Sequence, residues 1–226
     1  MRQLSITLLL IFLSLIGFGT PSYSAIKGGV NYSIPIDYSK LSETELTLKA
    51  EKYFQEAKKL PDEEIDENMT NALMLYTILQ KMDNDNIEYC VRLGILYDKL
   101  DKDRYAKGNF SRAISINHAR PEPYFYFGEF YYRRESYGKA LKYYKKAYAR
   151  GYENDYTLLC KLGDIYEKFG DSRVALNYLT LAYEQNPTEE LATQIQRLKN
   201  FDATNKEFYS DSRIQSKELY DWFIQF

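Results

Sequence analysis

Few residues in this chain have the types and spacing that catalysis requires. His118 is the only histidine, and Cys90 and Cys160 are the only cysteines among 226 residues. No serine or cysteine has a histidine nearby in the sequence to serve as a base, and no glycine-rich phosphate loop or metal-ligand cluster is present. Carboxylates are plentiful, as on any charged helical surface, and mark no site. We therefore expect a protein that is not an enzyme and that holds no cofactor and no metal.

The chemistry that the sequence does supply is that of binding. Aromatic residues make up 16% of the chain, and 23 of them are tyrosine. The 30 Lys and Arg residues face 32 Asp and Glu residues, so the formal net charge is −2 and the basic excess of a nucleic-acid binder is absent. With 45% hydrophobic and 27% charged residues, the composition is typical of a folded protein. It argues against a disordered chain, a multi-span membrane protein or a disulfide scaffold.

The first 24 residues have the pattern of a secretory signal peptide. A basic start precedes an apolar stretch over 4–18, and Ser22 and Ser24 supply the small residues that precede a cut. We expect cleavage after Ser24, export to the periplasm or beyond, and no integral membrane span in the mature chain. The alternative is an uncleaved anchor helix, although a spanning helix needs about 20 apolar residues. Residues 25–40 then form an extended leader.

A period of 34 or 35 residues organises the rest of the chain. Gly94, Gly128 and Gly163 are separated by 34 and 35 residues, and their neighbours recur at fixed offsets. Apolar or aromatic residues stand four and one positions before each glycine, and a tyrosine stands three positions after it. Alanines at +12 and +19 flank an aromatic residue or leucine at +16. This recurrence predicts a stack of similar units.

Each unit reads as a helical hairpin. The residues at −4, −1 and +3 share one face of a first helix, and those at +12, +16 and +19 share one face of a second. The small residues allow the two helices to approach closely. Polar turns that begin at Asp101, Glu135 and Gly170 separate them. Because one hairpin cannot cover its own apolar face, the hairpins must stack.

This pattern resembles the tetratricopeptide repeat (TPR), whose signature combines a Leu-Gly pair, a tyrosine, a spaced alanine and a closing proline. The stretch from Gly170 to Pro187 matches that signature best. The resemblance implies an all-α, right-handed α-solenoid of about four hairpins and a capping helix. Within an array over 41–201 we assign a divergent repeat 1 to 41–85, repeat 2 to 87–120, repeat 3 to 121–155, repeat 4 to 156–189 and the capping helix to 189–200.

Both ends of the array depart from the repeat pattern. A capping box at Ser42 and Glu45 opens repeat 1, and an acidic insert over 60–67 separates its two helices. Residues 202–226 form a tail that we expect to be a short amphipathic helix docked on the array. The alternative is a tail that offers Trp222 to another chain.

The resemblance also implies a binding site, because the first helices of TPR proteins line a concave groove for peptides. Val91 and Ile95 stand where some family members begin a carboxylate clamp with Lys and Asn, so that clamp is absent here. The same offsets also place Asp98 and Lys99 on the groove side. The binding residues that we expect are Glu88, Arg92, Phe125, Tyr126, Glu129, Tyr132, Arg133, Lys161, Asp164 and Lys168.

Repeat 3 concentrates the aromatic residues, and two interpretations of them stay open. They pack between repeats, since tyrosine can bury its ring while its hydroxyl reaches water, or Phe125 and Tyr132 form a binding hot spot. A basic block in the same repeat is either a solvated outer face or a surface for an anionic partner: Arg133, Arg134, Lys139, Lys142, Lys145, Lys146 and Arg150. The aromatic residues beyond the repeat signature are Phe125, Tyr126, Phe130, Tyr132, Tyr137, Tyr143, Tyr148 and Tyr152.

These observations predict a non-catalytic scaffold or assembly adaptor of the cell envelope that binds a peptide or protein segment. One alternative is a structural protein that associates with itself. Another is a binder of an anionic envelope polysaccharide through repeat 3. Cys90 and Cys160 fall on first helices two repeats apart, beyond the reach of a disulfide, so we expect two free thiols.

Overall fold

The computed structural model describes residues 38–209, with side chains described up to residue 200. The expected signal peptide, most of the leader and Trp222 lie outside this range. The chain divides into two units, residues 1–40 and 41–226. In the first unit the described part is the 3-10 helix η1 (Tyr38–Lys40). The end of the leader is therefore helical, where the sequence analysis predicted an extended segment.

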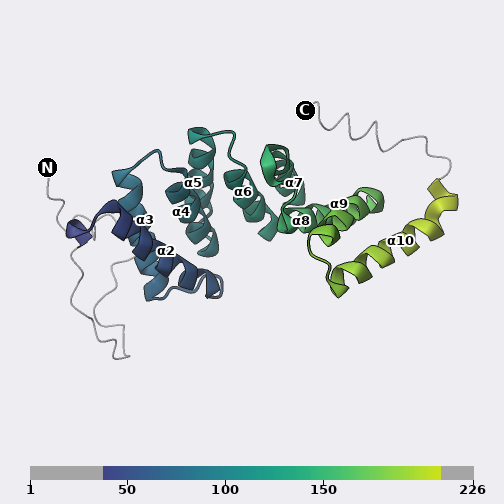
Figure 1. The fold of residues 1–226 in the computed structure, drawn as a ribbon, viewed down its shortest axis with the longest axis horizontal. Coiled ribbons are helices and arrows are strands. Elements are labelled where there is room, and N and C mark those ends of the chain that lie inside the picture. The colour runs from purple at the N-terminus through teal and green to yellow at the C-terminus, as the bar shows by residue number, and fades with distance from the viewer. Residues whose placement is uncertain (1–37, 210–226) are drawn as a thin grey trace. The chain divides into compact units, whose positions relative to one another are not determined.

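The second unit is built from four helical hairpins and a last helix, as predicted (Figure 1). Among the described residues every regular element is a helix. The last helix, α10 (Glu189–Tyr209), is longer than the predicted 189–200 because neither glycine nor proline interrupts it. The hairpins are α2 (Glu43–Lys59) with α3 (Glu67–Met82), α4 (Ile87–Lys99) with α5 (Asp103–Ile116), α6 (Glu122–Arg133) with α7 (Tyr137–Ala147), and α8 (Tyr156–Lys168) with α9 (Ser172–Gln185).

Each glycine of the repeat marks the point where the two helices of a hairpin touch. A Cβ on Gly128 would lie 2.4 Å from Cδ1 of Tyr144, and one on Gly94 would lie 2.5 Å from Cε1 of Phe110. Gly163 has the same relation to Leu179, at 2.5 Å. The bulky residue at +16 thus fills the space that the missing side chain leaves, which explains why the two positions recur together.

The turns between paired helices also repeat in detail. Asp101, Glu135 and Gly170, all seven positions after the repeat glycine, have φ values of 54°, 54° and 78°. In each turn the next residue donates its backbone N–H to a carbonyl five positions back, as Lys102 does to Tyr97 at 2.8 Å. This is the left-handed helix end that glycine favours. Two of the three turns therefore place a residue with a side chain in a strained conformation.

Repeat 3 is one residue longer than repeat 2, and a π-helical turn, η2 (Tyr148–Tyr152), absorbs the difference. A π turn closes its hydrogen bonds over five residues and so holds one residue more than an α turn. Gly151 lies within it at a φ of 114°. The turn occupies the place where repeat 4 has its closing proline.

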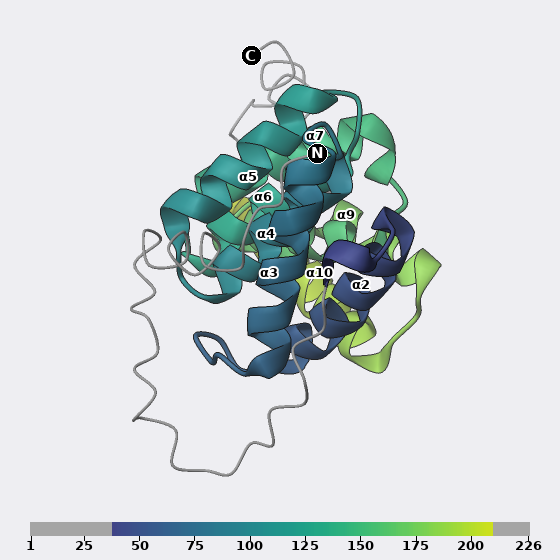
Figure 2. The same cartoon turned by 90° about the vertical axis from the view of Figure 1, so that its left-hand side faces the viewer.

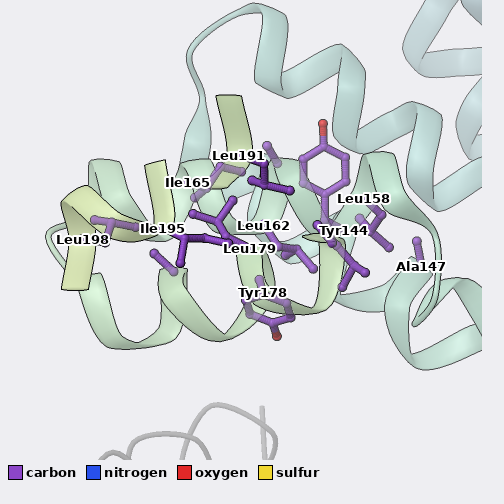
Figure 3. Packing of buried hydrophobic residues seen from close by; sticks show 14 of the residues in the cluster. Tyr144, Ala147, Leu158, Leu162, Ile165, Tyr178, Leu179, Leu191, Ile195 and Leu198 are labelled. Carbon is purple, nitrogen blue, oxygen red and sulfur yellow. The ribbon is translucent and has the colours of Figure 1, made fainter. Parts of the chain in front are cut away.

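Successive hairpins pack through both of their helices. First helices contact first helices, α2 with α4 and α4 with α6, and each second helix contacts the next first helix. Figure 2 shows α3, α4 and α5 side by side in this arrangement. At the other end α10 packs on α9 and buries Leu191, Ile195 and Leu198 against the last hairpin (Figure 3). None of the helices within residues 38–209 has the length and apolar character needed to cross a membrane.

Candidate binding face

The ten residues predicted to bind a partner are all at least partly exposed, and they lie on three consecutive first helices. Glu88 and Arg92 are on α4, five residues including Phe125 are on α6, and three residues including Lys168 are on α8. Because α4 packs on α6, and Tyr132 and Glu129 on α6 contact residues of α8, these side chains form one surface. We call it the first-helix face and define it as Glu88, Arg92, Phe125, Tyr126, Glu129, Tyr132, Arg133, Lys161, Asp164 and Lys168.

Much of the first-helix face is engaged in contacts between neighbouring repeats. In repeats 2 and 4, the residue two positions before the repeat glycine pairs with a glutamate on the first helix of the preceding repeat. Arg92 Nε lies 3.1 Å from Oε2 of Glu51 on α2, and Lys161 Nζ lies 3.8 Å from Oε2 of Glu129. Between these polar pairs, Tyr126 and Ile95 pack on a small cluster around Cys90. Offsets along a single helix do not predict these contacts.

Tyr132 joins α6 to α8. Its hydroxyl donates a hydrogen bond to Oδ2 of Asp164 at 2.5 Å, and Nζ of Lys161 lies 3.9 Å from its ring centroid. Burial raises the pKa of Tyr132, and the hydrogen bond to the carboxylate raises it further. Lys168 Nζ lies 3.6 Å from Oδ1 of Asp164, and its side chain is 40% exposed. Lys168 is thus among the least enclosed charges of this face.

A second polar relationship occurs inside two of the hairpins. The hydroxyl of Tyr144, at +16 in repeat 3, hydrogen-bonds Oε1 of Glu129, at +1. The hydroxyl of Tyr76 in repeat 1 bonds Oε2 of Glu51 at 2.6 Å in the same way, with Ala50 in the place of the glycine. In repeats 2 and 4 the +16 residue is Phe110 or Leu179, which has no hydroxyl, and the +1 residue is not glutamate. The joint occurrence of Tyr and Glu was the signal that could have predicted this pair.

Phe125 and Tyr132, the predicted hot spot, both rest on Tyr144. Their ring centroids lie 6.0 Å and 6.4 Å from that of Tyr144, and Phe125 also contacts Tyr126 at 5.3 Å and Tyr152 at 5.8 Å. Burial raises the pKa of Tyr152 to about 12. Both rings therefore pack within repeat 3, and Tyr132 also contacts repeat 4, while each residue remains partly exposed.

Two residues that the helical offsets placed on the groove side, Val91 and Asp98, belong to the core. Val91 is fully buried, and Asp98 is 6% exposed. The offsets misplaced both because they describe one helix alone, whereas α2 and α6 pack against α4. Of the two interpretations left open for the aromatic residues of repeat 3, Phe130 fits packing, since it is fully buried and the guanidinium carbon of Arg134 lies 3.8 Å from its ring centroid.

The basic block of repeat 3 is not simply a solvated surface. Arg134 Nη1 lies 2.6 Å from Oδ1 of the buried Asp98, and Arg133 Nη1 lies 3.0 Å from its Oδ2. On α7 and just beyond it, Lys146 and Arg150 lie over the ring of Tyr124, at 5.8 Å and 4.4 Å from its centroid. These cations are partly neutralised or stacked inside the fold.

The acidic insert between α2 and α3 reaches across the array. Asp62 Oδ1 lies 3.3 Å from Nζ of Lys99 on α4, and its Oδ2 lies 2.8 Å from Nη2 of Arg133 on α6. The backbone N–H of Glu63 donates to the carbonyl of Lys99 at 2.9 Å, and Nζ of Lys99 donates to the carbonyl of Leu60. An element of repeat 1 is thereby joined to repeats 2 and 3.

The described residues contain little that points to reactive chemistry. No group of three or more His, Cys, Asp or Glu side chains between 38 and 200 could hold a metal ion. Cys90 and Cys160 are both free thiols, as predicted, and burial raises the pKa of each. His118 is exposed on the turn after α5, where its carbonyl accepts a hydrogen bond from Arg150.

No protein-family model matches the sequence, and no curated protein matches it. Solved structures do. A structure of MamA aligns with 79% of this chain and 98% of its own, at 15% identity and a TM-score of 0.55. Another MamA structure aligns with 62% of this chain and 82% of its own, at 18% identity and a TM-score of 0.53. YrrB, described as a TPR protein with an unusual peptide-binding site, aligns with 58% of this chain and 68% of its own, at 22% identity and a TM-score of 0.53.

The chain has the tetratricopeptide repeat fold.

Apolar residues occupy the positions of a TPR carboxylate clamp. Val91 is buried and Ile95 packs on the same small cluster as Tyr126, so both positions are used for apolar contact between repeats. The TPR array of this chain therefore presents its charges elsewhere on the first helices, at Arg133 and Lys168 among others.

Proposed function

We propose that this protein is a non-catalytic scaffold or adaptor that binds a peptide or protein segment on the first-helix face. The observation that carries the proposal is the continuity of that face: α4 packs on α6, and Glu129 and Tyr132 on α6 contact side chains of α8. Part of its aromatic and charged side chains is exposed. Aromatic and arginine side chains supply most of the energy at protein interfaces. The TPR fold supports the same conclusion, because TPR arrays are interaction modules.

We further propose that the chain is exported to the cell envelope by its first 24 residues. The support is the sequence pattern of a basic start, an apolar stretch and small residues before the expected cut. Mass spectrometry of the protein purified from its own cells tests this part. An N-terminus at Ala25 supports it, and a chain that keeps Met1 in its own cells contradicts it.

Affinity capture with a matched pair of variants tests binding at the first-helix face. The full chain carries a C-terminal tag and is produced in its own cells. In the test variant Lys161→Glu/Lys168→Glu, both changes lie on the first-helix face. In the control Lys142→Glu/Lys199→Glu, the same charge change falls on exposed residues of α7 and α10. A thermal melt checks that both variants fold.

The expected result is a protein that the parent and the control capture and that the test variant loses. Equal capture by all three chains would place the partner elsewhere and contradict the proposal. Self-association is the alternative function, and light scattering of the purified chain distinguishes it, because a multimer forms without any other protein. Binding of an anionic envelope polysaccharide is the other alternative, tested by pull-down with Tyr126→Ala/Tyr132→Ala.

A further inference from the structure

The first helices of repeats 2, 3 and 4 carry a row of basic side chains. Lys99, Arg133 and Lys168 each stand five positions after the repeat glycine, one on α4, one on α6 and one on α8. Lys99 and Arg133 are close in space, because both contact the same carboxylate of Asp62. Lys168 holds the same offset on α8, and it is joined to α6 through Asp164, which pairs with Lys168 and accepts a hydrogen bond from Tyr132, the neighbour of Arg133 in sequence.

The acidic insert provides the counter-charge for the first two positions of this row. The connection in repeat 1 covers residues 60–66, whereas the connections of the other hairpins cover three residues each. The extra length carries Asp62 to Arg133, two repeats away. The insert is therefore an acidic segment that already lies on basic side chains of the first helices.

Two ion pairs of Asp62 hold the insert on these side chains, together with two backbone contacts to Lys99, in which Glu63 N–H donates to the Lys99 carbonyl and Lys99 Nζ donates to the Leu60 carbonyl. The side chain of Asp62 is 58% exposed in both of its ion pairs, and ion pairs with an exposed partner contribute little to stability. Glu63 and Glu64 are exposed, and neither has an ion pair among the described residues. Ile65 is 52% exposed. An outside segment that offers more carboxylates along the row can compete with such an occupant.

We infer that the insert occupies, within its own chain, a binding site for an acidic segment of a partner protein. The site consists of Lys99, Arg133 and Lys168, and the partner displaces Asp62 and extends to Lys168, which the insert does not reach. This inference rests on the proposed function, since it names the class of partner for the same face. It also explains why a tightly packed array keeps a connection of this length and charge.

A peptide-binding assay with the full chain tests the inference. The probe is a fluorescein-labelled synthetic peptide with the sequence of residues 60–67, and the control peptide replaces its Asp and Glu residues by Asn and Gln. The variant Asp62→Asn/Glu63→Gln/Glu64→Gln changes exposed insert residues only and frees the site. Fluorescence anisotropy at low salt measures the dissociation constant of each peptide with the parent and with the variant.

The variant is expected to bind the acidic probe about three- to tenfold more tightly than the parent, the range that two ion pairs with an exposed carboxylate supply. Added salt should weaken this binding because it screens exposed charges. Introducing Lys168→Gln should remove part of the gain, whereas Lys142→Gln on α7 should leave it unchanged. Lys168 is a suitable change because its side chain is 40% exposed and its ion pair is with Asp164, one turn away on the same helix.

Equal binding of the acidic probe by parent and variant would overturn the inference, and so would equal binding of the neutral peptide by the variant. These outcomes are separate from a failure of the proposed function. A partner that the parent captures and the Lys161→Glu/Lys168→Glu variant loses would keep the first-helix face as a binding site, even if the peptide assay showed that the insert does not compete for it.

Discussion

The hydroxyl of Tyr144 on α7 hydrogen-bonds the carboxylate of Glu129 on α6, and the ring of Tyr144 fills the space beside Gly128. One side chain thus fixes the distance between the two helices and also orients an acid on the first-helix face. Glu129 in turn lies 3.8 Å from Lys161 of the next repeat. Packing inside a hairpin is in this way linked to the polar contacts between hairpins.

This pair predicts a change of stability at alkaline pH. Burial and Glu129 raise the pKa of Tyr144 well above its usual value near 10, so the folded state keeps the proton that the unfolded state loses. The stabilisation is complete below pH 10 and falls above it by about 1.4 kcal/mol per pH unit for one such tyrosine. Tyr144→Phe should cost about 1–3 kcal/mol at pH 7, and the difference from the parent should shrink above pH 10.

Urea unfolding from pH 7 to 11.5 measures this effect. Tyr137→Phe is the matched control, because Tyr137 is partly exposed and its hydroxyl makes no hydrogen bond among the described residues. A constant difference between the parent and Tyr144→Phe across the whole range would show that Tyr144 is not the protected group.

Gly128→Leu should disrupt repeat 3. A Cβ at this position would lie 2.4 Å from the ring of Tyr144, which is fully buried and cannot move aside. Overpacking of this kind costs about 1–3 kcal/mol or more. Gly138→Leu on α7 is the control, since no heavy atom lies within 4 Å of a Cβ there. Thermal melts should show a lower Tm for the first variant only, and equal melts would mean that the helices do not meet at Gly128.

The turn residues with positive φ values predict that two substitutions change the free energy of unfolding in opposite directions. Glu135 is exposed and has a φ of 54°, so Glu135→Gly should stabilise the protein by about 1 kcal/mol. Gly170 holds the same position in repeat 4 with a φ of 78°, and Gly170→Ala should destabilise it by about the same amount. Chemical denaturation of both variants checks the signs. A loss of stability in Glu135→Gly would refute the common turn geometry.

Asp98 should be the most sensitive carboxylate of the array. It is the one buried charged side chain among the described residues, and Arg133 and Arg134 both bond to it. Asp98→Asn should cost about 2 kcal/mol, because it weakens charged hydrogen bonds in a buried place. Asp101→Asn, at an exposed partner of Arg134, should cost well under 1 kcal/mol. Similar losses in the two variants would contradict this difference in burial.

The repeat itself could be predicted from sequence because its determinants are local. The spacing of Gly94, Gly128 and Gly163 fixed the hairpins, and the small residues at these points indicated where helices meet. The predicted last helix was too short because no glycine or proline marks the end of α10. The end of repeat 3 was hard to predict because it has no closing proline, and the π turn η2 lies there instead.

The candidate site was harder to predict, because contacts between repeats decide which side chains remain available. Offsets along one helix correctly put Arg133 and Lys168 at the surface, but they also put Val91 there, which the neighbouring hairpin buries. The contact of Asp62 with Arg133 joins residues 71 positions apart. A local pattern cannot predict a contact between residues so far apart in the sequence. The acidic insert, together with a basic residue five positions after each repeat glycine, was nevertheless a usable signal.

Site-specific photocrosslinking shows directly whether a partner segment lies on the first-helix face. A photoreactive phenylalanine analogue replaces Lys168 on α8 in one chain and Lys142 on α7 in another, and each chain is irradiated in its own cells. Binding on the first-helix face predicts a crosslinked partner from position 168 and none from position 142. A partner crosslinked from position 142 alone would place binding on the second helices and contradict the proposed function.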